Sequence, residues 1–272
     1  MQDIRPPNLG ALESPTDPRR ILLGRVQDPV VLPKTYTLDV SALPTYYQNG
    51  LPECGGYSVA NAQTELRAIE VPIIEDLSGR FAYAIAKTLD GLPDKEGTTL
   101  AALMHSWYLK GIPLNKFFPS DETLPLIVSK DVSLITPEAY ADAATRKIKS
   151  YAFLDDLSEQ GLRQAIYQNK VVIALKKPWI PGVYEGGHFI CLDGFDETRI
   201  RFRNSFPLTT SFGGNGGYEG WLTKEDLPTI KEAATVLDIA GWRLALMTSQ
   251  LKLLREVAYL LQQQVSQRSQ TT

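Results

Sequence analysis

The stretch YQNGLPECGGYSVANA, residues 47–62, decides how this chain is interpreted, because it places one of the two cysteines at the start of a helical pattern. After Cys54, apolar side chains recur at roughly helical spacing, at Tyr57, Val59, Ala60, Leu66 and Ile69. A helix is therefore predicted to begin at or beside Cys54. The helix dipole and the unpaired N–H groups there favour a thiolate, and Gly55 and Gly56 leave the sulfur accessible.

Three further polar residues lie where a cysteine nucleophile needs them. Gln48 precedes Cys54 by six residues, so its side-chain amide could join the Cys54 N–H in binding an oxyanion. His188 follows two glycines and opens a predicted strand, and Asn204 ends the next one sixteen residues later, where it could orient the imidazole. Each has an ordinary structural interpretation, as a turn residue, an edge histidine or a strand end. Together with Cys54 they predict a Cys–His–Asn site.

These segments resemble those of the papain-like cysteine peptidases, in particular their bacterial-type branch, over about residues 34–222. YQNGLPECGGYSVANA is similar to the family's oxyanion-glutamine and nucleophile segment. GGHFICLDGFDETRIRFRNSF is similar to its histidine strand and the strand that ends in Asn-Ser-Trp. FGGNGGYEGWL resembles the Trp-Gly…Gly-Tyr stretch, DLSGRFAYAIAK the helix that often begins Leu-Ser, and EGTTLAALMHSWYLKGIP the glycine wall of the substrate cleft with the helix behind it.

The sequence also departs from the family pattern. Gly55 follows the nucleophile where the family usually has Trp, and Leu51 stands where a disulfide cysteine commonly lies. Phe206 and Phe212 replace the two tryptophans that shield the asparagine–histidine pair. A helical propeptide of the family's usual length is not recognised.

The resemblance implies a cysteine endopeptidase that acts on peptide or protein substrates through a thioester acyl-enzyme, without a cofactor. Cys54 would be the nucleophile, His188 its base, and Asn204 and Gln48 the orienting and oxyanion residues. Gly97 and Gly187 are expected to line the substrate strand, because side chains there would block its approach. Two alternatives remain: a catalytically silent papain-like module used for binding or assembly, and a cysteine amidase or acyltransferase that uses the same dyad.

The fold class implied is α+β, in two lobes. Residues 1–31, rich in Pro, Asp and Arg, are expected to form an extended arm, and residues 32–243 a papain-like domain. Helical patterns fill about 50–145, and short strand patterns separated by Gly, Asp and Pro fill about 146–240 as an antiparallel sheet.

An amphipathic helix and tail are predicted for residues 244–272. Its apolar side chains alternate in steps of four and three, at Met247, Leu251, Leu254, Ala258, Leu261 and Val265. Packing on its own domain and association with a second copy or a partner are both open interpretations. Binding to a membrane surface is disfavoured, because the polar face carries few cations.

Composition excludes several function classes. A net charge of -3 and a pI near 5.6, with no basic cluster, argue against nucleic acid as a partner. Two histidines and the absence of CxxC or HExxH spacing argue against a metal site. With no signal peptide or membrane span recognised, two free thiols and a cytoplasmic location are expected. Cys191 and His105 are interpreted as packing and structural residues.

Overall fold

The structure is a computed structural model that describes residues 10–39, 41–48, 50–70, 73–119, 130–177, 187–208 and 217–237, all within one structural unit. The predicted C-terminal helix and tail, residues 244–272, lie outside the described residues. No helix in the described ranges combines the length and the apolar character needed to cross a bilayer.

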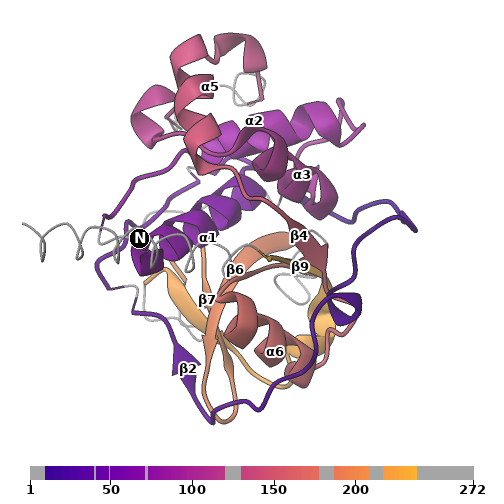
Figure 1. The fold of residues 1–272 in the computed structure, drawn as a ribbon. Helices are drawn as coiled ribbons and strands as arrows, with labels where there is room; N and C mark the ends of the chain where they lie inside the picture. Colours follow the sequence, from indigo (N-terminus) through magenta and orange to yellow (C-terminus); the bar gives the residue numbers. More distant parts are fainter. Residues whose placement is uncertain are drawn as a thin grey trace, which may run out of the picture. The chain divides into compact units, whose positions relative to one another are not determined.

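The helices form one side of the fold (Figure 1): α1 (Cys54–Glu70), α2 (Gly79–Leu89), α3 (Leu100–Lys110) and α5 (Pro137–Ala143). Local sequence fixes their starts. Ser78 and Thr99 cap α2 and α3 by accepting hydrogen bonds from backbone N–H groups three residues later. Gly111, with φ near 77°, ends α3, because glycine adopts this positive φ without strain.

Helix α1 begins at Cys54, as predicted, and is the central helix of the structure. It packs against α2 on one side and against the sheet, chiefly strand β6, on the other (Figure 1). Nearly all of its first thirteen residues are buried for that reason. This position brings the helix N-terminus to the boundary between the helices and the sheet.

The other side is an antiparallel sheet with the strand order β4-β9-β5-β6-β7-β8. Its strands are β4 (Tyr151–Phe153), β5 (Val172–Lys176), β6 (His188–Phe195), β7 (Ile200–Arg203), β8 (Glu219–Leu222) and β9 (Ile230–Val236). Helix α6 (Glu159–Asn169), capped by Ser158, packs on β6 and β5 and closes a core that includes Leu162, Ile166, Ile190 and Leu192. The predicted α+β class with an antiparallel sheet is confirmed.

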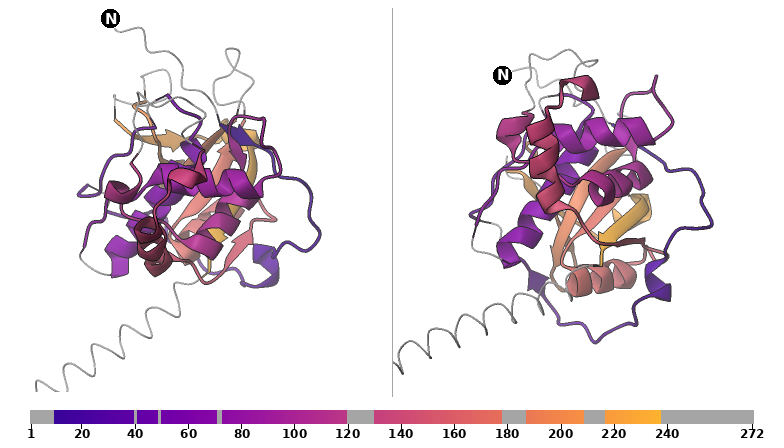
Figure 2. Two further views of the ribbon diagram at one scale, coloured as in Figure 1. Left: turned by 90° about the horizontal axis from the view of Figure 1, so that it is seen from above. Right: turned by 45° about the horizontal axis from the view of Figure 1, so that its top comes forward.

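Residues 10–37, which comprise the described part of the predicted N-terminal arm and the first residues of the predicted domain, run along the outside of the sheet. They end in β2 (Tyr36–Thr37), which pairs with the far end of β6 (Figure 2). On the way, the short 3-10 helix η1 (Leu23–Arg25) places Leu23 in the sheet core. At its start, the arm forms β1 (Ala11–Leu12), which pairs in parallel with β3 (Thr98–Thr99) just before α3. The beginning of the arm therefore lies between the helices and the sheet.

Candidate active site

The thiol of Cys54 lies at the N-terminus of α1, facing the first residues of β6. The backbone N–H of Phe189, the residue that follows His188, lies close enough to the sulfur to lower the pKa of the thiol. A Cβ at Gly55 would stand 2.4 Å from Leu103 Cδ1 and 3.0 Å from the Phe189 ring. That crowding favours glycine after the cysteine, because a larger side chain would have to displace Leu103 and the Phe189 ring.

His188 opens β6 and is fully buried beside Asn204, which directly follows β7. The imidazole Nε2 lies 2.6 Å from Asn204 Oδ1, and Asn204 Nδ2 donates to the Phe206 carbonyl at 2.8 Å. Because an amide oxygen only accepts, Nε2 carries the proton in the neutral ring, and Nδ1 is left as the basic nitrogen.

An aromatic ring covers this pair, as the family resemblance implied. The centroid of Phe206 lies 4.8 Å from that of His188, which shields the hydrogen bond to Asn204 with an apolar face. The second predicted cover, Phe212, lies outside the described residues.

Gln48 is held at the same boundary by four hydrogen bonds, one of which runs from the Leu51 N–H to the Gln48 carbonyl at 2.9 Å. Its Nε2 donates to the Leu51 carbonyl at 2.6 Å, its Oε1 accepts from Ser205 Oγ at 2.5 Å, and its backbone N–H donates to the Ser205 carbonyl at 2.9 Å. An amide nitrogen has two hydrogens, so one remains for a developing oxyanion. Sequence reasoning missed Ser205, although its place next to Asn204 is the signal that could have found it.

Burial sets the protonation of the thiol and the imidazole. Loss of hydration raises the pKa of the Cys54 thiol to about 11, against the opposing effect of backbone N–H groups from Phe189, Gly10 and Gly55. Burial likewise lowers the pKa of His188 to about 4, with the bond to Asn204 opposing it. The expectation that the helix N-terminus would favour a thiolate is therefore wrong for this arrangement, because desolvation outweighs the helix dipole.

The two predicted wall glycines lie on either side of an extended peptide, and that peptide is the chain's own arm. A Cβ at Gly97, whose φ is 79°, would stand 2.1 Å from the Gly10 carbonyl oxygen, and one at Gly187 would stand 2.8 Å from the Ala11 carbonyl oxygen. Sequence reasoning placed Gly97 and Gly187 at a strand-binding site but missed that residues 10–12 fill it.

The second cysteine is in a different setting. Cys191, in the middle of β6, is fully buried and donates to Glu65 Oε1 at 3.9 Å, while Arg203 Nη1 lies 3.4 Å from the same oxygen. Burial and the negative charge of Glu65 raise the pKa of the Cys191 thiol. Both thiols are free, as predicted, and Cys191 is a packing residue.

The buried imidazole predicts a specific loss of stability in acid. In the unfolded chain His188 titrates near pKa 6.5, whereas in the folded chain its pKa is about 4, so the unfolded state binds more protons between these values. Stability should fall as pH drops from about 6.5 toward 4, and His188 should contribute on the order of 2 kcal/mol to the loss between pH 7 and pH 5.

Urea unfolding of the wild-type chain and of His188→Gln at these two pH values measures that contribution. The drop in unfolding free energy should be smaller in His188→Gln, while His105→Gln, which removes an exposed histidine on α3, serves as the control. An equal drop in wild type and His188→Gln would contradict the buried neutral imidazole.

Comparison with known proteins gives a clear answer at the level of fold. No family model and no curated protein sequence matches the chain. Among solved structures, xylellain, a cysteine protease from Xylella fastidiosa, is similar with a TM-score of 0.68 and 17% identity, covering 84% of this chain and 95% of its own. ProCathepsin B S9 from Trypanosoma congolense has a TM-score of 0.61 and 12% identity, covering 84% and 85% of the two chains.

A third similar structure is procathepsin L 3 from the larval midgut of Tenebrio molitor, with a TM-score of 0.61 and 11% identity over 80% of this chain and 74% of its own. All three are papain-like cysteine proteases, and their likeness extends over most of the chain. The chain has a central helix that begins at Cys54 and an antiparallel sheet whose strand β6 begins at His188. With these features, the similarity identifies the fold of the chain as that of the papain-like cysteine proteases.

Proposed function

We propose that this chain is a papain-like cysteine peptidase that hydrolyses peptide bonds, with Cys54 as nucleophile, His188 as base, Asn204 as its orienting residue and Gln48 as an oxyanion donor. The observation that carries the proposal is the 2.6 Å bond between His188 Nε2 and Asn204 Oδ1. This bond leaves Nδ1 basic, at the start of a strand whose next residue, Phe189, has its backbone N–H near the Cys54 thiol.

The chemistry follows from these atoms once a substrate carbonyl reaches the sulfur. Cys54 gives its proton to His188 Nδ1 as the sulfur bonds to the carbonyl carbon, and the negative oxygen is bound by the Cys54 N–H and the free Gln48 Nε2 hydrogen. Collapse of this intermediate expels the amine, which takes the proton from His188, and leaves a thioester. Water, deprotonated by His188, then hydrolyses the thioester and restores the thiol.

The extended segment of the chain itself that lies in the cleft favours a peptide substrate over a non-peptide amide. Residues 10–12 lie in it as an extended strand, paired with β3 on one side and bridged to Gly187 on the other. Main-chain pairing on two sides suits a polypeptide, because it uses groups that every residue carries. The motifs around Cys54 and His188 further support kinship with the bacterial-type branch of the family.

Labelling with a thiol-directed peptidyl epoxide tests this proposal. Over a long incubation, mass spectrometry should find the label on Cys54 and not on Cys191, and a mixture of peptides should be cleaved by the wild-type chain but not by Cys54→Ala. Cleavage that persists in Cys54→Ala, or a label found on Cys191 instead, would contradict it.

A further inference from the structure

Lys176, the last residue of β5, is a buried cation beside the imidazole of His188. The two residues are direct partners in the antiparallel β5–β6 pair. Such partners carry their side chains on the same face of a sheet, with Cβ atoms about 4.5–5.5 Å apart. The Lys176 side chain is 6% exposed and His188 is fully buried. The strand register therefore places an ammonium group next to the residue that we propose as the base.

An irregularity in the sheet fixes the end of β5. The register between β5 and β9 shifts between Leu175 and Lys176, whereas the register between β5 and β6 continues without a shift as far as His188. Just beyond the shift, the Lys177 N–H donates to the Thr229 carbonyl at 2.8 Å. The end of β5 is thus held on both sides, and Lys176 stays opposite His188.

A carboxylate partly balances the Lys176 cation. Asp226 lies in the connection between β8 and β9, and its Oδ1 is 3.6 Å from Lys176 Nζ. Its Oδ2 accepts from the Thr223 N–H at 3.0 Å and from the Thr223 hydroxyl at 3.1 Å. The Asp226 side chain is 36% exposed, so water screens the carboxylate more than it screens the buried ammonium. Part of the positive field of Lys176 therefore reaches His188.

Three groups that face the imidazole from other elements are Cys54 of α1, Lys176 of β5 and Asn204 after β7, and of these Lys176 carries a charge. The Cys54 thiol is neutral because its pKa is about 11. Burial lowers the pKa of His188 to about 4, the charge of Lys176 lowers it further, and the bond to Asn204 opposes both effects. Burial also lowers the pKa of Lys176, and Asp226 opposes this loss of charge.

We infer that Lys176, balanced by Asp226, controls the protonation of His188, because its positive charge destabilises the imidazolium and makes it a stronger proton donor. This inference rests on the proposed function, in which His188 takes the Cys54 proton and passes it to the leaving amine. A cation beside the ring opposes the first transfer and favours the second. Lys176 is thus a positioning residue that acts on the reaction through His188.

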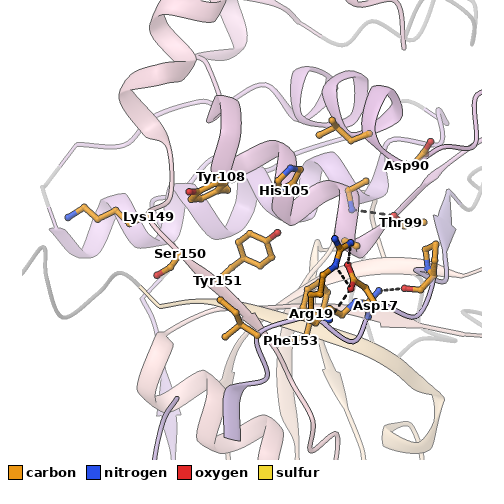
Figure 3. A pocket seen from close by; sticks show the side chains of 16 residues that line it. Asp17, Arg19, Asp90, Thr99, His105, Tyr108, Lys149, Ser150, Tyr151 and Phe153 are labelled. Carbon is orange, nitrogen blue, oxygen red and sulfur yellow. Dashed lines mark hydrogen bonds and ion pairs between the residues drawn. The ribbon is translucent and has the colours of Figure 1, made fainter. Parts of the chain in front are cut away.

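Nuclear magnetic resonance of the imidazole C2–H tests this inference without a substrate. The chain has two histidines, so His105→Gln assigns both signals. Figure 3 shows His105 on α3 at a cavity of about 810 Å³, where its exposed ring stacks on Tyr108. The His105 signal should be the same in every variant and serves as the internal reference.

Lys176→Gln removes the charge, while the new amide can still donate to Asp226. The His188 signal should titrate near pH 4 in the wild-type chain and on the order of one pH unit higher in Lys176→Gln. Lys176→Met should repeat this shift, and Lys176→Arg, which keeps the charge, should titrate as wild type. Lys177→Gln is the matched control, because it makes the same change at a neighbouring side chain that is 41% exposed and paired with Glu13.

The reactivity of Cys54 gives a second measurement. Without the Lys176 charge the proton passes more easily from Cys54 to His188, so iodoacetamide should alkylate Cys54 faster in Lys176→Gln, by up to about tenfold at pH 7. Asp226→Asn leaves the cation unbalanced and should slow the alkylation. Opposite changes distinguish an electrostatic role from simple loosening of the fold, which would speed alkylation in both variants.

An unchanged His188 midpoint in folded Lys176→Gln and Lys176→Met would overturn the inference, and so would an equal shift in Lys177→Gln. If neither neutral variant folds, Asp226→Asn decides, and alkylation no slower than in wild type would overturn the inference. A raised His188 midpoint in a chain that hydrolyses no peptide, whether wild type or variant, would uphold the control by Lys176 and overturn the proposed peptidase activity.

Discussion

Cys54→Ala and His188→Ala are each expected to abolish peptide hydrolysis, lowering kcat by a factor on the order of 10⁴–10⁶. Without the thiol no acyl-enzyme can form, and without the imidazole no group transfers the proton. The imidazole Nδ1 is the only basic ring nitrogen in the neutral tautomer, because Nε2 is committed to Asn204. Loss of His188 therefore removes the base and not merely a hydrogen bond.

The variants are compared with the wild-type chain, with a fluorogenic peptide as substrate. Cys191→Ala is the matched control: it also removes a buried thiol, but one that bonds to Glu65 and lies away from the cleft. It should keep most of the activity. Turnover that survives in Cys54→Ala but disappears in Cys191→Ala would reverse the assignment of the nucleophile.

Gln48→Ala is expected to lower kcat by roughly 10²–10³ with little change in KM, because one oxyanion donor acts on the charge that develops only in the transition state. Ser205→Ala should have a smaller effect of the same kind, since the Ser205 hydroxyl only holds Gln48 Oε1, at 2.5 Å. Ser205 is thus a positioning residue. A change confined to KM in either variant would contradict this mechanism.

Asn204→Ala should also leave residual activity, because orienting a base supplies only part of the barrier reduction. In the structure Asn204 fixes both the ring and its tautomer, so its loss should slow turnover and shift the pH–rate profile without ending catalysis. Steady-state kinetics across pH on Asn204→Ala and Gln48→Ala separate the two roles. An Asn204→Ala enzyme as inactive as Cys54→Ala would contradict this ranking.

Much of the local structure was predictable because it depends on short-range periodicity and capping. Three element ends depend only on residues that are near in sequence, within one or two helical turns or a few strand residues. They are the start of α1 at Cys54, the end of α3 at Gly111 and the start of β6 at His188. Phe206 as a cover for the imidazole was implied by the resemblance to the papain-like family, and the structure places the two rings in contact. The hydrogen bond that connects Ser205 to Gln48 spans 157 residues and left no such local trace.

The sequence by itself indicated three of the residues that meet at the boundary of helices and sheet, because Cys54, His188 and Asn204 each lie at the start or end of an element with a clear local pattern. Gln48 lies in the loop before α1, where no such pattern marks it. Only the tertiary structure decided the state of that site. Gly10 reaches Cys54 by long-range contacts that no spacing reveals, and the burial it completes leaves the thiol neutral, with a pKa of about 11. Desolvation depends on everything packed around the sulfur, so a helix N-terminus that favours a thiolate in isolation holds a protonated thiol here.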